Sequence, residues 1–287
     1  MNTIMRKWFM ALSLLSYAGL CMAADKITLP LRFERGIPIV ELQIGKNNYS
    51  FMLDTGASEK IYVTRADAMS KPGLVRTGKL LKSINISGQV TKTEELVVKD
   101  LLVNGMSFGR TEGRFCAERG TDNGASLQGP PDVSVLGISF FKTRKSFFDF
   151  AAREVVIFDE TEPNVHDWVK LGYVRIHEGI IIINLSSLNE TYYMVLDSAS
   201  TISLVNSNKV GPKESPNACD SGSGPGGDAC RKISVGLKEE PKFAAVLMEL
   251  PENFNADGLV GRAFFDQYAV FLDIPNRSIR VRSYTKK

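Results

Sequence analysis

Histidine and cysteine are scarce in this sequence, and their scarcity excludes several kinds of chemistry. The 287 residues include two histidines, His166 and His177, and four cysteines. Neither histidine lies near a cysteine pair, so a tetrahedral zinc site lacks ligands. A serine or cysteine hydrolase needs a histidine placed as general base, whereas both histidines lie in polar surroundings near the middle of the chain. We therefore expect no metal, no cofactor and no histidine-activated nucleophile.

Long runs of one charge are also missing. Lysine and arginine number 35 against 32 acidic residues, which gives a net charge of +3. No basic stretch is interleaved with aromatic residues, so nucleic acid is excluded as an expected partner. The glycine-rich residues 222–227 are not followed by a helix carrying Lys-Ser/Thr, which argues against a phosphate-binding loop.

The amino-terminal segment is typical of an export signal. Arg6 and Lys7 give it a charged start, an uncharged stretch follows, and small residues stand at Ala23 and Ala24, where a signal peptidase would cut. We expect residues 1–24 to be removed, although the stretch is just long enough to remain as a membrane anchor. Loss of the two basic residues lowers the net charge from +3 to +1 (3 − 2). The mature chain is therefore expected to be periplasmic or secreted.

Export to an oxidising compartment changes the interpretation of the remaining cysteines. Cys219 and Cys230 bracket a segment rich in Gly, Ser and Asp, residues 220–228, which is typical of a flexible loop. A disulfide bond between them is predicted, worth about 2–3 kcal/mol from the entropy of loop closure. Cys116 is left over and is expected to be a buried thiol rather than a nucleophile.

An internal repeat organises the chain. Gly36 opens a strand, a turn and a second strand that ends on Asp54, and Gly179 opens a similar series that ends on Asp197. The distance from glycine to aspartate is 18 residues in both segments. The repeat therefore predicts two aspartates at matching strand ends.

A second pair of matching segments lies downstream. Gly137 and Gly261 each end an apolar run, precede a Phe-Phe pair, and lie 12 residues before Asp149 or Asp273. Strand patterns dominate, and a polar, proline-containing segment separates the halves. These features predict an all-β chain of two similar lobes. The expected division is an amino-terminal lobe at residues 25–160, a linker at residues 161–172 and a carboxy-terminal lobe at residues 173–287.

Asp54-Thr55-Gly56 and Asp197-Ser198-Ala199 resemble the paired active-site loops of aspartic peptidases. The element lengths are similar to those of retropepsins, and the fusion into one chain is similar to pepsins. The resemblance covers about residues 30–285. It implies the acid-protease fold, two retropepsin-like β-barrel lobes related by a pseudo-twofold axis, with Asp54 and Asp197 as catalytic residues. It also implies that one carboxylate activates water while the other, protonated, donates a hydrogen bond to the scissile carbonyl.

The residues beside the two aspartates have expected supporting roles. The hydroxyl groups of Thr55 and Ser198 are expected to cross between the loops and lock them together. Gly56 would let the backbone approach the carboxylates. The Ser200 hydroxyl is expected to bond the second aspartate, a contact that Ala57 cannot make for the first. That difference predicts a raised pKa for the pair and an activity optimum in mildly acidic to near-neutral conditions.

Ala199 departs from the glycine of the family pattern. Its methyl group would strain the turn if a positive φ is required there, and it would narrow the cleft. Two functions therefore stay open, an endopeptidase that cuts between apolar residues and an inactive peptidase-like protein that binds peptides. A third, a secreted β-protein in which Asp54 is incidental, is disfavoured by the repeat.

A hairpin that covers the substrate is expected at residues 82–96, with Gly88 at its tip. It lacks the tyrosine that pepsin-like flaps carry. The matching part of the second half is expected to contain the disulfide loop. We expect a monomer that takes a peptide or protein substrate.

The compartment is left open between two routes. A strand expected at residues 27–33 leaves no room for a prosegment after the signal, which favours a bacterial periplasm. A eukaryotic secretory route is kept open by five Asn-x-Ser/Thr triplets. They begin at Asn48, Asn85, Asn184, Asn189 and Asn276.

Overall fold

The computed structural model describes most of the chain beyond the predicted signal. The described residues are 26–44, 46–64, 73–84, 90–116, 133–159, 163–171, 174–177, 179–188, 190–219 and 230–285. Residues 1–24 and Gly88 lie outside this set, so the signal peptide and the hairpin tip stay predictions. Within the described ranges, no helix combines the length and apolar character needed to cross a membrane.

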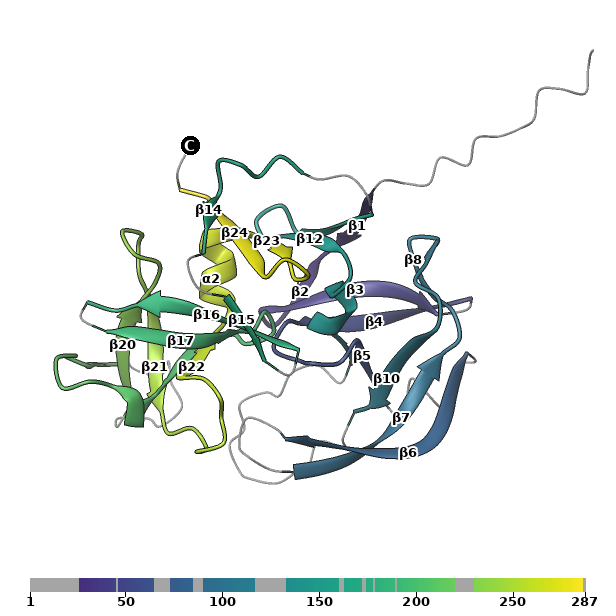
Figure 1. Ribbon diagram of the computed structural model, residues 1–287, viewed down its shortest axis with the longest axis horizontal. Coiled ribbons are helices and arrows are strands. Elements are labelled where there is room, and N and C mark those ends of the chain that lie inside the picture. Colours follow the sequence, from purple (N-terminus) through teal and green to yellow (C-terminus); the bar gives the residue numbers. More distant parts are fainter. Residues whose placement is uncertain are drawn as a thin grey trace, which may run out of the picture.

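The all-β prediction is confirmed. The described residues form strands in three sheets, together with three short helical pieces (Figure 1). The helical pieces are η1 (Ile138–Phe141), η2 (Ser207–Lys209) and α2 (Arg262–Gln267).

The first-half sheet has ten strands. From β6 along the sheet, each strand pairs with the next, and β2 (Arg32–Glu34) pairs with β3 off this path. The order is β6 (Leu74–Ile84), β7 (Val90–Val98), β10 (Thr111–Phe115), β5 (Ile61–Val63), β11 (Ser134–Gly137), β4 (Asn47–Asp54), β3 (Ile37–Ile44), β8 (Leu101–Val103) and β9 (Met106–Ser107).

The second-half sheet has eight strands. Their order is β15 (Val174–His177), β16 (Ile180–Ser186), β17 (Thr191–Leu196), β22 (Gly258–Val260), β18 (Ser203–Asn206), β21 (Phe243–Met248), β20 (Arg231–Val235) and β19 (Asn217–Ala218). The run from β16 to β20 has the same alternation of antiparallel and parallel pairings as the run from β3 to β7 in the first half. The sequence repeat is thus matched by a repeat in strand pairing.

A six-stranded sheet joins the halves and was not anticipated. Its order is β1 (Lys26–Pro30), β13 (Glu154–Phe158), β12 (Lys145–Asp149), β23 (Tyr268–Asp273), β24 (Ser278–Ser283) and β14 (Val169–Lys170). The central pairing, between β12 and β23, connects a strand of the first half with one of the second. The prediction of two β-barrel lobes is therefore wrong in one respect: the sheets are open, and strands near both ends of the chain form a shared third sheet. A pseudo-twofold axis stays a prediction.

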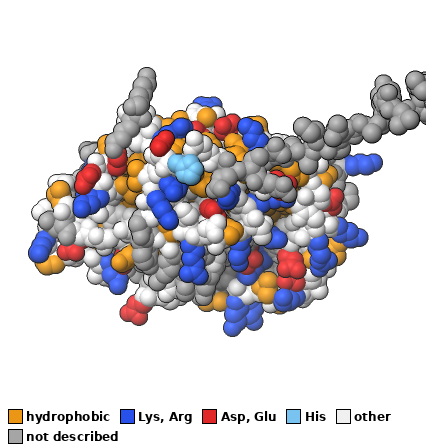
Figure 2. Space-filling model, turned by 45° about the horizontal axis from the view of Figure 1, so that its top comes forward, with side chains coloured by type: hydrophobic (Ala, Val, Ile, Leu, Met, Phe, Trp, Pro, Cys, Tyr) orange, Lys and Arg blue, Asp and Glu red, His pale blue; other side chains and the backbone are white. Residues whose placement is uncertain are grey.

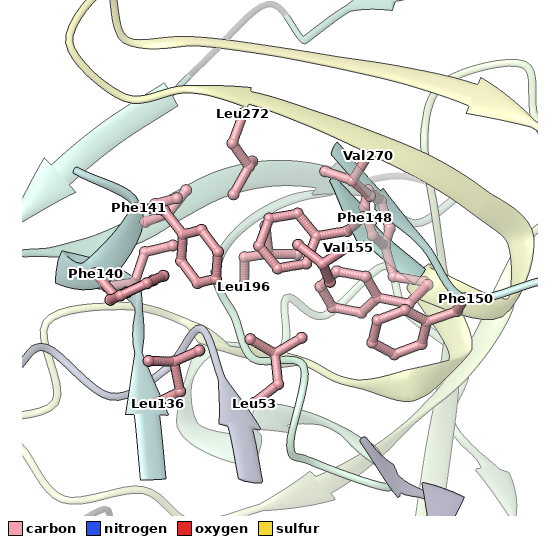
Figure 3. Packing of buried hydrophobic residues seen from close by; sticks show 14 of the residues in the cluster. Leu53, Leu136, Phe140, Phe141, Phe148, Phe150, Val155, Leu196, Val270 and Leu272 are labelled. Atoms are coloured by element: carbon pink, nitrogen blue, oxygen red, sulfur yellow. The ribbon is translucent and has the colours of Figure 1, made fainter. Parts of the chain in front are cut away.

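One continuous core runs through both halves. Phe148 lies opposite Val270 in the shared sheet, with Leu272 beside them (Figure 3). Leu53 and Leu196, which directly precede the two aspartates, are fully buried in the same cluster. Alternation along the strands places these side chains inward. The core therefore fixes the strand ends from which the candidate site is built.

The surface of the described part carries mixed charge. On the face drawn in Figure 2, Lys and Arg side chains are spread out, with Asp and Glu side chains between them. Apolar side chains are scattered among the charged ones on this face. The charge is thus distributed on this face rather than gathered into a single-sign field.

Candidate active site

The two aspartates lie at equivalent strand ends. In the first half β4 ends on Asp54, which is paired with Gly137 of the parallel strand β11. In the second half Leu196, the last residue of β17, is paired with Val260 of the parallel strand β22, and Asp197 follows it. The N–H of Asp197 donates to the carbonyl oxygen of Val260 at 3.0 Å. Both aspartates are therefore held by a parallel neighbour strand.

The two loops are tied together by their hydroxyl groups. Thr55 Oγ1 donates to the carbonyl oxygen of Leu196 (2.7 Å) and accepts from the N–H of Ser198 (2.9 Å). Ser198 Oγ donates to the carbonyl oxygen of Leu53 (2.8 Å) and accepts from the N–H of Thr55 (3.0 Å). Both side chains are buried. The structure thus contains the reciprocal contact that the sequence predicted.

Each carboxylate is held by backbone N–H groups of its own loop. Gly56 N–H donates to Asp54 Oδ1 at 2.8 Å. Ala199 and Ser200 N–H groups donate to Asp197 Oδ1 at 3.0 Å each. These donors favour the charged form of a carboxyl group and fix its orientation.

The carboxyl groups of Asp54 and Asp197 are close enough to shift each other's pKa. Burial, followed by the charge of Asp197, holds the pKa of Asp54 well above its usual range. Burial also raises the pKa of Asp197, against the lowering effect of its N–H donors and of Asp54. The arrangement favours one proton shared between the two carboxyl groups.

The glycines of the second repeat have matching roles in the two halves. A Cβ on Gly137 would lie 2.2 Å from the carbonyl oxygen of Glu59, and a Cβ on Gly261 would lie 2.4 Å from that of Ile202. Each of those carbonyls belongs to the fifth residue after an aspartate. Only glycine allows this approach of backbone to backbone. The two glycines of the sequence repeat thus make the same close contact with the loop that follows each aspartate.

Gly56 and Ala199 differ in the space around them. A Cβ on Gly56 would lie 2.9 Å from Asp197 Cγ. Ala199 carries its methyl group against an apolar cluster of the first half that includes Ile39 and Met52. Its φ is not among the positive values of the described residues, so the expected backbone strain at Ala199 is absent. The alanine also keeps the N–H donor that glycine would supply.

The expected role of Ser200 is not what the structure shows. The Ser200 hydroxyl donates to the carbonyl oxygen of Ile202 at 2.7 Å, not to the carboxylate. The Ser200 N–H takes the predicted place on Asp197. Burial, rather than the missing hydroxyl at Ala57, is therefore the first cause of the raised pKa of Asp54.

Tyr62 is a neighbour of the pair that sequence reasoning missed. It lies in β5, opposite Arg114 of β10, and packs with Ala199 against the same apolar cluster. Its pKa is raised, mainly by burial. The charges of Glu59 and Asp54 also raise this pKa, and a hydrogen bond with Ser58 lowers it. Its only sequence signal is its place in the strand that follows the loop.

The hairpin expected at residues 82–96 is present as the pair β6 and β7, in register from Ile84 and Val90. It begins earlier than expected, at Leu74. The predicted disulfide bond between Cys219 and Cys230 is confirmed, while Cys116 is half-buried and takes no part in it.

Two other features lie away from the carboxylates. A hollow of about 810 Å³, lined by Tyr193, Asn206 and Phe254 among others, lies by the opposite end of β17. Asp149 and Asp273 hold turns by accepting from the N–H groups of Ala152 and Asn276. In the described ranges no group of three or more His, Cys, Asp or Glu side chains could hold a metal ion.

Comparison with known proteins gives a likeness of fold alone. No family model and no curated protein matches the chain. Basic 7S globulin from soybean matches with a TM-score of 0.58 and 11% identity, covering 91% of this chain and 96% of the globulin. Conglutin gamma, a basic 7S globulin from lupine seeds, matches with a TM-score of 0.56 and 12% identity, covering 91% and 95%.

These matches correct the family assignment made from the sequence. The assignment to retropepsin-like peptidases is wrong, because the similar structures are seed globulins, each matched over nearly its whole length, and no family model supports it. The active-site tripeptides and short elements carried the retropepsin likeness, whereas the match over 91% of the chain is to these globulins. What the chain shares with them is the arrangement of its strands.

Proposed function

We propose that the chain hydrolyses peptide bonds, with water as the nucleophile, between Asp54 and Asp197. The observation that carries this proposal is the close pair of carboxyl groups, each held by N–H donors of its own loop and each with a raised pKa. The reciprocal contacts of Thr55 and Ser198 support it, because they fix the distance between the two loops.

The pair divides the acid–base work between its members. The ionised carboxylate of the pair takes a proton from water as the oxygen attacks the scissile carbonyl carbon. The protonated carboxyl group donates a hydrogen bond to the carbonyl oxygen and stabilises the tetrahedral intermediate. When the carbon–nitrogen bond breaks, the proton taken from water passes to the leaving amine. The site returns to its starting state with no covalent intermediate.

Peptide binding without turnover is the second candidate function. The comparisons favour it over hydrolysis, because both similar structures are described as globulins. Ala199, placed where the peptidase pattern has glycine, also motivates it. The same pair of loops would then hold a peptide through hydrogen bonds and the apolar cluster beside Ala199.

Cleavage of a mixed peptide library separates the two functions. The purified chain lacking residues 1–24 is incubated across a pH series, with and without a pepstatin-type inhibitor. Hydrolysis predicts cleavage that Asp54→Asn lowers by about 10²–10⁴-fold, the usual contribution of acid–base catalysis. Peptides retained by the folded protein but left intact at every pH would establish the second function, and Ala199→Gly would then be the next variant.

The location and assembly of the chain are part of the proposal. The confirmed disulfide bond supports an oxidising compartment, either a periplasm or the outside of a cell. A single chain supplies both aspartates, so a monomer is sufficient for the proposed site. Size-exclusion chromatography with light scattering checks the monomer, and detection of a chain beginning at Asp25 in the exported fraction checks the signal.

A further inference from the structure

The outer part of the β6–β7 hairpin leaves the sheet. β7 pairs with β10 only from Glu95 to Val98, and the register of β6 shifts between Arg76 and Leu80. Beyond that shift, residues 80–84 pair only with residues 90–94. We call these two segments the distal hairpin. It is a two-stranded ribbon, which is marginally stable on its own.

The distal hairpin also exposes apolar side chains. Leu80 is 64% exposed and Val90 is 57% exposed. These two side chains therefore do little to hold the ribbon against the rest of the molecule. Its position depends on the side chains of its other face, such as the buried Thr93, and on polar contacts with the body of the protein.

Arg114 makes such a contact. It lies in β10 with a side chain only 16% exposed, and its Nη1 donates to the carbonyl oxygen of Lys82 at 2.8 Å. Its Nη2 forms a close ion pair with Glu59 Oε1. Its Nε is buried and has no hydrogen-bond partner among the described residues. An arginine that leaves a buried donor unsatisfied is costly for stability, which favours a role in function.

Glu59 belongs to the active-site loop and is held firmly there. The neighbouring carbonyl of Lys60 accepts from Gly137 N–H at 2.9 Å, and that of Ala57 accepts from Ile138 N–H at 2.9 Å. Ser139 Oγ donates to the carbonyl oxygen of Ser58. The loop that carries Asp54 is thus the fixed end of the Glu59–Arg114–Lys82 chain of contacts.

We propose that Arg114 is a positioning residue that sets the place of the distal hairpin relative to the carboxylate pair. Its planar guanidinium joins the active-site loop, through the Glu59 carboxylate, to the backbone of the hairpin strand. The inference rests on the proposed function for its effect on substrate, but its effect on the hairpin does not. Lysine could not make both contacts in one plane, because its ammonium group is a single point charge.

Other ion pairs of the hairpin do not compete for this role. Arg76 pairs with Glu94, and Lys79 pairs with Glu95, but each pair joins β6 to β7 within the hairpin. The side chains of Arg76 and Lys79 are 70% and 62% exposed. Exposed pairs of this kind contribute little to stability. Lys79 therefore provides a control for the loss of one hairpin cation, because neither Lys79 nor its partner Glu95 belongs to the distal hairpin.

Hydrogen–deuterium exchange of the purified chain tests the proposal. In Arg114→Gln we expect the amides of residues 80–84 and 90–94 to exchange at least about 10-fold faster, with residues 95–98 unchanged. Lys79→Gln should leave exchange in the distal hairpin within about 3-fold of the wild type. Glu59→Gln keeps the shape of its side chain and should give an intermediate acceleration; it carries the test if Arg114→Gln does not fold.

The outcomes separate this inference from the proposed hydrolysis. Unchanged exchange in the distal hairpin, or equal acceleration throughout the sheet, overturns the positioning role. If the wild type cleaves peptides, Arg114→Gln should raise KM about 10-fold and leave kcat within about 3-fold. If the wild type does not cleave, the exchange result still stands, and only the proposed hydrolysis fails.

Discussion

The two active-site loops use the same backbone and different side-chain space. Each is clamped by a glycine that approaches the carbonyl of the fifth residue after its aspartate, and each places an N–H on its own carboxylate. On the first loop Gly56 lies too close to Asp197 to carry a side chain. On the second loop Ala199 packs its methyl group against apolar neighbours. The contrast shows that glycine is needed for steric reasons on one side only.

Exchanging the two residues sharpens that contrast and has the largest expected effect. Gly56→Ala should lower turnover about 100-fold. The added Cβ would lie 2.9 Å from Asp197 Cγ and would displace that carboxyl group. Ala199→Gly should change turnover less than about 3-fold. Peptide cleavage by both variants, at matched folded concentration, makes the measurement. Equal losses from the two variants would mean that the loops are sterically equivalent.

Removing the crossing hydroxyl groups tests whether the loops depend on each other equally. Thr55→Val and Ser198→Ala should each lower the free energy of unfolding by about 2–4 kcal/mol, because each leaves a buried N–H and a buried carbonyl without a partner. Urea unfolding measures both. The double variant should lose less than the sum, because each hydroxyl acts on the loop that carries the other. Additive losses of unfolding free energy would show that the two hydroxyl groups stabilise the fold independently.

The disulfide bond marks a difference between the halves. Cys219→Ser with Cys230→Ser should lower the free energy of unfolding by about 2–3 kcal/mol, the entropy of closing a short loop. We expect hydrogen exchange to accelerate in β19 and β20, with β6 and β7 unchanged. A loss spread evenly over both halves would contradict a local role.

The smallest effect concerns the raised pKa of Asp54. This pKa is raised in the folded state, so the folded chain binds the proton more tightly than the unfolded chain, where the pKa is about 3.9. The contribution of Asp54 to stability should therefore be fullest below about pH 4 and be lost as the pH rises through its raised pKa.

Asp54→Asn should remove most of this fall and raise the Tm at neutral pH, by about 2–4 °C for each kcal/mol gained in a chain of this size. Thermal melts of wild type and variant from pH 3 to pH 8 test the sign. If the Tm of the wild type rose relative to that of the variant as the pH increases, the predicted sign would be wrong. In activity, the same direction predicts an optimum between mildly acidic and neutral pH.

The candidate site was largely predictable because it is built from short-range patterns repeated twice. The two aspartates follow strands whose alternation can be seen in the sequence, and the hydroxyl of Thr55 or Ser198 stands directly beside each one. The predicted role of Ser200 was wrong because its hydroxyl donates to the carbonyl oxygen of Ile202, while its N–H donates to Asp197. The expected strain at Ala199 was wrong because its φ is not positive.

The parts that could not be predicted depend on contacts between distant segments. Arg114 reaches Glu59 and Lys82 across the sheet, and no local pattern marks it as different from other strand arginines. The shared sheet depends on the pairing of β12 with β23, which lie more than a hundred residues apart in the chain. Both halves contain strands of ordinary alternation there, so the sequence predicts pairing within each half.

The shared sheet makes the chain a single folding unit, because the sheet cannot form fully before β23 and β24 have been synthesised. Phe148 cannot find its partner Val270 until β23 has been translated, and the outer strand β24 is made later still. A ribosome stalled after α2 would leave the edge of β12 open, which invites pairing with other chains. Chaperone contact with β12 should therefore persist until translation is finished, although all of the first half has by then been made.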